Sequence, residues 1–168
     1  MNAVGLFGIV GWKNSGKTTL VERLVSDITK RGYKVSTVKH AHHSFDIDHK
    51  GTDSYRHRMA GASEVLLSSS NRWAIIHELK EESEPDFDFL VNKLGEVDLI
   101  LVEGFKYGKH QKLEVIRLEN KKSPLFEEDK TIVALATDGM RTNKGLPAFN
   151  INEVSKIADF ILKQVGIK

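Results

Sequence analysis

The sequence contains no cysteine, which excludes disulfide bonds and thiolate metal sites and fits a reducing cytoplasm. It also lacks an excess of charge of either sign: the formal net charge is only +2, so no strongly basic nucleic-acid surface is expected. No apolar stretch approaches the length of a membrane span, and no basic segment typical of a signal peptide precedes the first apolar run. We therefore expect a cytoplasmic protein that binds neither nucleic acid nor a membrane.

Length and composition indicate an ordinary globular chain. Hydrophobic residues make up 40% of the sequence and charged residues 29%. A chain of 168 residues can bury a substantial core within one domain. We expect residues 1–168 to form a single nucleotide-binding domain, for the reasons that follow.

One segment, GWKNSGKT at residues 11–18, fits the phosphate-binding loop pattern of two spaced glycines followed by lysine and serine or threonine. The apolar run at residues 4–10 predicts a buried strand before it. After it, apolar residues recur at helical spacing from Leu20 to Ile28, and Gly32 is suited to end a helix. Strand, loop and helix are the context that the motif requires, so a glycine-rich turn without a ligand is the weaker interpretation.

The residue types in this loop suit the binding of a nucleotide and Mg²⁺. Gly11 and Gly16 let the backbone turn tightly and bring its N–H groups close to an anion. Lys17, the first candidate catalytic residue, supplies charge for the β- and γ-phosphates, and Thr18 offers a hydroxyl to Mg²⁺. The predicted nucleotide-binding set also includes three residues within or next to the loop, Asn14, Ser15 and Thr19.

The rest of the chain alternates between strand and helix patterns, which predicts an α/β fold with a mostly parallel sheet and helices on both faces. Two apolar runs joined by Ser70-Asn71 predict an added β-hairpin. We expect strands at residues 34–39, 64–69, 72–77, 97–102, 113–118 and 131–136. We expect helices from Thr52 or Asp53 to Ala60, from about Asp86 to Leu94, and from Asn152 onward.

An acidic residue at the end of a strand is expected to complete the phosphate site. Asp98 and Glu103 bracket a buried run, and five residues of strand span about 17 Å, so they lie at opposite ends. Ligands sit beyond the carboxyl ends of parallel strands, which favours Glu103. We predict that Glu103 binds Mg²⁺, through a water, or positions the attacking water. The alternative is an exposed carboxylate without a function.

A histidine-rich loop follows the second predicted strand. His40, His42, His43 and Asp46 could contact an anionic ligand near the phosphates, or could bind a transition metal, and a polar loop without a function is the third interpretation. Asp53 lies just beyond this loop. It either caps a helix or faces the metal.

Asp138 follows the strand predicted at residues 131–136, at the ligand edge of the sheet. A carboxylate there could accept hydrogen bonds from the N1–H and the 2-amino group of guanine, a pair of donors that adenine lacks. The interpretation without a ligand, a turn residue before Gly139, is equally open.

Three segments together resemble the molybdopterin-guanine dinucleotide biosynthesis protein B family (MobB). They are GWKNSGKTTL, VKHAHHSFDIDHKGTDSYRHRMAGA and DLILVEGFK, in this order and spacing. The first segment is shared by many families, whereas the second is much more specific. The resemblance covers nearly the whole chain and implies a three-layer P-loop NTPase fold with an added hairpin.

The resemblance also implies a function: a GTP-binding adaptor with slow GTP hydrolysis that assists the synthase (protein A) attaching GMP to molybdopterin. It implies a homodimer, GTP and Mg²⁺ as ligands, and raises molybdopterin itself as a further ligand. Gly11, Gly16, Lys17, Thr18 and Glu103 correspond to phosphate and Mg²⁺ ligands in this reading. Two other classes stay open at this point, an ATP-dependent small-molecule kinase or ligase and a metal-delivery GTPase.

Overall fold

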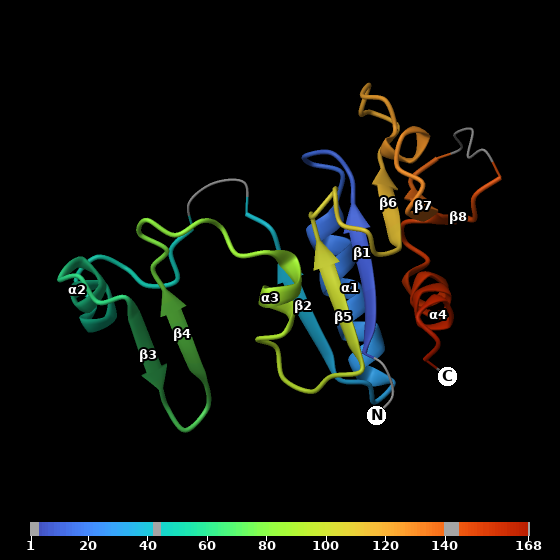
Figure 1. Ribbon diagram of the computed structural model, residues 1–168. Coiled ribbons are helices and arrows are strands. Elements are labelled where there is room, and N and C mark those ends of the chain that lie inside the picture. The colour runs from blue at the N-terminus through green and yellow to red at the C-terminus, as the bar shows by residue number, and fades with distance from the viewer. Residues whose placement is uncertain (1–3, 42–44, 140–144, 168) are drawn as a thin grey trace. The chain divides into compact units, whose positions relative to one another are not determined.

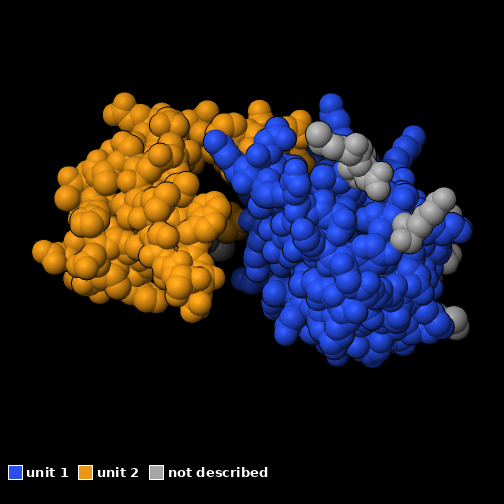
Figure 2. All heavy atoms as spheres, turned by 90° about the horizontal axis from the view of Figure 1, so that it is seen from below, with its two compact units in different colours: residues 1–40, 91–168 blue, residues 41–90 orange. Residues whose placement is uncertain are grey.

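The computed structural model describes residues 4–41, 45–139 and 145–167. The chain divides into two compact units, which Figure 2 colours blue and orange. The first comprises residues 1–40 and 91–168, and the second comprises residues 41–90. This division leaves the expectation of a single domain untested, and each unit is described by itself.

The first unit is built on a six-stranded sheet in the order β2-β5-β1-β6-β7-β8, in which every pair of neighbouring strands is parallel (Figure 1). All six carboxyl ends therefore lie at one edge. The strands are β1 (Gly5–Val10), β2 (Val35–Lys39), β5 (Leu99–Glu103), β6 (Lys112–Ile116), β7 (Ile132–Thr137) and β8 (Ala148–Asn150).

Helices α1 (Lys17–Lys30) and α4 (Val154–Gln164) pack against one face of this sheet and against each other. Their buried stripes repeat at helical spacing, as in Leu20, Leu24 and Ile28 of α1. These side chains meet fully buried strand residues such as Phe7 and Leu101. Burying an aliphatic or aromatic side chain of this size contributes about 1.5–3 kcal/mol, so this layer holds the first turn of α1 firmly against the sheet.

A short 3₁₀ helix, η1 (Leu125–Glu127), lies on the other face, where its Phe126 packs with Val10 and Leu135. A buried carboxylate fixes this helix. Glu114 on β6 accepts hydrogen bonds from the backbone N–H of Leu125 at 2.8 Å and of Phe126 at 2.9 Å. Both bonds satisfy N–H groups at the start of η1, which would otherwise lack partners away from water.

The second unit contains α2 (Asp53–Met59) and an antiparallel hairpin of β3 (Glu64–Ser68) and β4 (Trp73–His77). Helix α3 (Phe87–Val91) spans the boundary between the units. Arg58 of α2 holds the second unit together, because its largely buried guanidinium binds Asp48 at 2.6 Å and also Glu78. These bonds raise the pKa of Arg58, Asp48 first and Glu78 second, and keep it charged.

The predicted α/β fold with an added hairpin is confirmed, and strand bounds agree within about two residues. Two elements were not predicted: β8, with three residues, and η1. Helix α3 was expected from about Asp86 to Leu94, but it is shorter and ends at Val91. Among the described residues, no helix combines the length and the apolar character needed to cross a membrane.

The hairpin carries an ionic cluster that makes a pH prediction. His77 lies opposite Glu64, with Nδ1 2.8 Å from Oε1, and its Nε2 lies 3.4 Å from Glu82. These contacts, Glu64 first, raise the pKa of His77 above its ordinary value of 6.5. The raised pKa stabilises the folded hairpin at pH values below the unfolded pKa, and this contribution is lost as pH rises through the folded pKa.

We expect NMR titration of the imidazole to show a pKa above 6.5 for His77, and Glu64→Gln to lower it, because the main hydrogen-bonding carboxylate is removed. Glu81→Gln is the control, because the His77 ring contacts Glu64 and Glu82 through its two nitrogens. An unchanged pKa in the Glu64→Gln variant would contradict the assignment.

Candidate functional site

The loop at residues 11–16 leaves the carboxyl end of β1, which is flanked by β5 on one side and β6 on the other. From β1 the chain first crosses to β2, on the β5 side of β1, and it later adds β6 on the opposite side of β1. Parallel sheets bind ligands at such a reversal of strand order. The site can therefore draw on the loops that follow three adjacent strands, although these are far apart in the sequence.

The loop has the backbone that its glycines predict. Gly11, Asn14 and Gly16 adopt positive φ angles of 147°, 63° and 94°. A Cβ on Gly11 would lie 2.5 Å from the carbonyl oxygen of Val115 and 2.8 Å from Oγ of Ser15. Gly11 is thus packed tightly against Val115 of β6, and α1 begins directly after Gly16, at Lys17. The N-terminal N–H groups of α1 provide an anion-binding end.

Lys17 folds back over the loop, where its Nζ donates to the carbonyl oxygen of Trp12 at 2.8 Å. Burial lowers the pKa of Lys17, Glu103 opposes this, and the nearby charges of Lys106 and Lys39 lower it further. Several cations therefore gather around a single nearby carboxylate. An anion bound here would relieve their mutual repulsion.

Glu103 lies at the carboxyl end of β5, as the strand pattern predicted, and its side chain reaches the first turn of α1. Its Oε1 accepts a hydrogen bond from Oγ1 of Thr18 at 2.7 Å and lies 3.5 Å from Nζ of Lys39. Its side chain is only 11% exposed. A hydroxyl and a carboxylate brought together suit Mg²⁺, which prefers oxygen ligands and keeps several waters. Thr18 and Glu103 are therefore the residues that would hold this ion, directly or through water.

Asp98 lies at the opposite end of β5, where its Oδ2 accepts from the backbone N–H of Lys34 at 2.7 Å. This bond gives Asp98 a structural role in joining the start of β2 to β5, away from the phosphate loop. Asp98 and Glu103 therefore lie at opposite ends of β5, as the length of the strand between them predicted.

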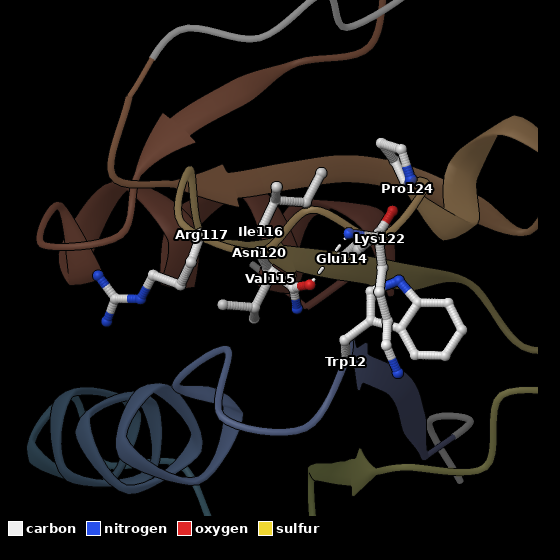
Figure 3. Close-up of a pocket in the computed structure, with 8 residues that line it drawn as sticks. All are labelled: Trp12, Glu114, Val115, Ile116, Arg117, Asn120, Lys122 and Pro124. Atoms are coloured by element: carbon white, nitrogen blue, oxygen red, sulfur yellow. Dashed lines mark hydrogen bonds between the residues drawn. The ribbon is translucent and has the colours of Figure 1, made fainter.

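Trp12 was not singled out from the sequence, yet it connects the loop to two other segments. Its Nε1 donates to the carbonyl oxygen of Ser123 at 2.9 Å, and Nζ of Lys106 and of Lys122 lie 4.3 and 4.4 Å from its ring centroid. A small pocket opens beside it, lined by Trp12, Glu114, Val115, Ile116, Arg117, Asn120, Lys122 and Pro124 (Figure 3). These partners of Trp12 are about 95 to 110 positions away in the sequence, so sequence spacing does not reveal the contacts.

Arg117, which directly follows β6, was also missed. Its Nε donates to the carbonyl oxygen of Ser15 at 3.1 Å, and its Nη1 lies 3.3 Å from Oδ2 of Asp138. The side chain points away from Trp12 and Lys122 (Figure 3). Asp138 also accepts from the backbone N–H of Leu118 at 3.0 Å, so each of its oxygens already has one partner. Its predicted role toward guanine stays a prediction.

The histidine-rich loop is described only in part. His40 follows β2, with its backbone N–H bonded to the carbonyl oxygen of Glu103 at 3.1 Å and its ring 4.9 Å from that of Phe105. His42 and His43 lie outside the described residues. Asp53 belongs to the second unit, in the first turn of α2, 3.8 Å from Arg56. Within the residues described, no group of three His, Cys, Asp or Glu side chains is placed to hold a metal ion.

Comparison with known proteins agrees with this geometry. Residues 6–138 match the family model of molybdopterin guanine dinucleotide synthesis protein B. The chain belongs to the MobB family. This match contains the phosphate loop, Glu103 and Arg117, and it ends at Asp138.

Relatives from two bacteria match nearly the full length. The molybdopterin-guanine dinucleotide biosynthesis adapter protein of Escherichia coli (strain K12) is 36% identical, over 95% of this chain and 93% of that protein. Its namesake from Haemophilus influenzae is 39% identical, over 95% and 89%. The crystal structure of Bacillus subtilis MobB has a TM-score of 0.76 at 25% identity, over 96% and 98% of the two chains.

The site geometry separates the roles of the two carboxylates on β5. If Thr18 and Glu103 hold Mg²⁺, Glu103→Gln should lower Mg²⁺-dependent hydrolysis of a nucleoside triphosphate by about tenfold or more, because the charged oxygen that would face the ion is lost. Nucleotide binding should fall less. Asp98→Asn, the matched control at the far end of the same strand, should change neither. Phosphate release and calorimetric titration measure the two effects, and a larger loss in Asp98→Asn would contradict the assignment.

Proposed function

We propose that this MobB-family protein binds GTP with Mg²⁺ and acts as an adaptor in the biosynthesis of molybdopterin guanine dinucleotide. Its partner is the synthase that attaches GMP to molybdopterin. The observation that carries the proposal is the hydrogen bond of 2.7 Å from Oγ1 of Thr18 to Oε1 of Glu103. It lies beside a loop with the phosphate-binding pattern, in a chain of this family. The names of the relatives from Escherichia coli and Haemophilus influenzae support the adapter role.

The arrangement of side chains supports the binding of GTP more than its rapid hydrolysis. Fast phosphoryl transfer uses a residue that orients water and an arginine that reaches the transferring phosphate. Among the described residues, Arg117 contacts the loop, and its guanidinium donates to Ser15 and Asp138 instead. We therefore propose slow intrinsic GTP hydrolysis, with Lys17 and Glu103 as the residues that act on the phosphates and the metal.

Lys17→Ala tests the nucleotide site. Removal of the loop's ammonium group should weaken GTP binding by about tenfold or more, since an ionic hydrogen bond contributes about 1.5–3 kcal/mol. Lys13→Ala, an exposed lysine of the same loop, is the control and should bind GTP like the wild type. Calorimetric titration with GTP and Mg²⁺ measures both. Affinity within twofold of the wild type in Lys17→Ala would overturn the nucleotide site.

The same variants test the adaptor role. The wild type should capture purified synthase with GTP present, and Lys17→Ala should capture less if the complex depends on nucleotide. Strong stimulation of hydrolysis by one small acceptor, without capture of the synthase, would instead favour a kinase or ligase.

We also propose that the protein forms a homodimer through its hairpin. The register pairs Leu66 with Ile75, and alternation places Trp73 on the same face. These three side chains are 64%, 49% and 69% exposed, whereas Val65 on the opposite face is buried. An apolar face of this kind on a two-stranded sheet favours burial against another surface.

Trp73→Glu should weaken the dimer, because it places a charge within this apolar face. Sedimentation velocity at micromolar concentration should show a dimer for the wild type and a larger monomer fraction for the variant. Tyr107→Ser removes an aromatic ring that is fully exposed outside the hairpin and should leave the dimer intact. A wild type that sediments as a monomer would contradict the proposal.

A further inference from the structure

Three segments distant in sequence meet at the guanidinium of Arg117. It follows β6, donates through Nε to Ser15 of the phosphate loop, and contacts through Nη1 the carboxylate of Asp138 after β7. Leu118, the next residue, donates its backbone N–H to the other oxygen of Asp138. The ends of β6 and β7 are therefore tied together and to the loop after β1.

The bond to Ser15 determines the direction of a backbone N–H. No cis peptide bond occurs among the described residues, and in a planar trans peptide the carbonyl of Ser15 and the N–H of Gly16 point in opposite directions. Arg117 holds this carbonyl on its own side of the loop. The N–H of Gly16 is thereby directed to the other side, as phosphate binding by loop N–H groups requires.

Glycine at position 16 makes such a restraint necessary. Gly16 has a φ of 94°, which glycine adopts readily, but glycine adopts negative φ equally well. The residue type therefore permits the conformation without selecting it. Arg117 also packs on Gly16 itself, because a Cβ there would lie 3.0 Å from its Nη2.

Asp138 holds the guanidinium in turn. The backbone N–H of Leu118 lowers the pKa of Asp138, burial opposes this, and Arg117 lowers it further, so the carboxylate stays ionised at neutral pH. An ionised acceptor makes the stronger hydrogen bond to a guanidinium, whose planar shape allows donation to Ser15 and Asp138 together.

We infer that Arg117 is a positioning residue for the phosphate loop: it orients the Ser15–Gly16 peptide for anion binding, and Asp138 orients Arg117. The inference rests on the proposed nucleotide site and adds a role for Asp138 that does not require contact with a base. Phosphate affinity then depends on a carboxylate in the turn after β7.

The test uses a ligand without a base, inorganic tripolyphosphate with Mg²⁺, titrated calorimetrically into the full chain. Arg117→Gln should weaken its binding by about tenfold, since a charged hydrogen bond is removed. Arg117→Lys should weaken it too, because one ammonium does not reproduce the planar fork. Arg23→Gln is the control: Arg23 lies on α1 and donates to Asn152, so its loss should leave tripolyphosphate binding unchanged.

A double-mutant cycle tests the part played by Asp138. Asp138→Asn should weaken tripolyphosphate binding by roughly threefold, and in the Arg117→Gln background it should add no further loss, because residues in one network couple. Thermal melts without ligand establish that each variant is folded. Independent, additive losses would overturn the role of Asp138.

The outcomes separate this inference from the proposed function. A wild type that binds neither GTP nor tripolyphosphate overturns the nucleotide site itself. A wild type that binds both, with Arg117→Gln or Arg117→Lys within twofold for tripolyphosphate, overturns the inference alone. The inference is also overturned if Arg117→Gln weakens the binding of GTP but not that of tripolyphosphate, because the arginine would then act on the base and not on the loop.

Discussion

The hydrogen bond between Thr18 and Glu103 joins the first turn of α1 to the end of β5, and the site depends on it. It forms because β1 and β5 are parallel neighbours, with Ile9 paired to Glu103. The apolar stripe of α1 packs on the same sheet, and this packing fixes the position of the N-terminus of α1 relative to the strands. Core packing thus decides where a hydroxyl and a carboxylate meet, and a hard cation needs just such oxygen donors.

A second chain of contacts supports the loop from the β6 side. Glu114 is buried on β6, and its carboxylate is stabilised by two backbone N–H groups of η1. The segment leading into η1 contains Lys122 and Ser123, which contact Trp12 of the phosphate loop. A buried charge requires hydrogen-bond partners, and here those partners also fix a segment that reaches the ligand edge. A structural requirement of the core therefore shapes the surroundings of the site.

The phosphate loop and Glu103 were predictable because their chemistry lies in local patterns: glycine spacing, a strand before, a helix after, and a carboxylate at the end of a strand. Arg117 was not predictable in this way. Its partner Ser15 is 102 residues away, and their contact exists only because β6 pairs with β1. Strand β8 was missed because three residues carry little periodicity, although it pairs along β7. Local rules identify the loop motif and the carboxylate at the end of the strand, whereas sheet order decides which distant residues contact them.

Asp138 illustrates how local sequence and the order of strands in the sheet both bear on the role of one residue. From the sequence it is equally a turn residue or an acceptor for guanine, and its contacts with Leu118 and Arg117 give it a third role. These roles are compatible, because an ionised carboxylate has about four lone-pair positions, and the contacts with Leu118 and Arg117 occupy two of them. Its side chain is 31% exposed, which leaves room for a further donor. A base bound there would meet the same carboxylate that contacts Arg117, which in turn donates to Ser15 of the loop, so recognition of base and phosphates would be energetically coupled.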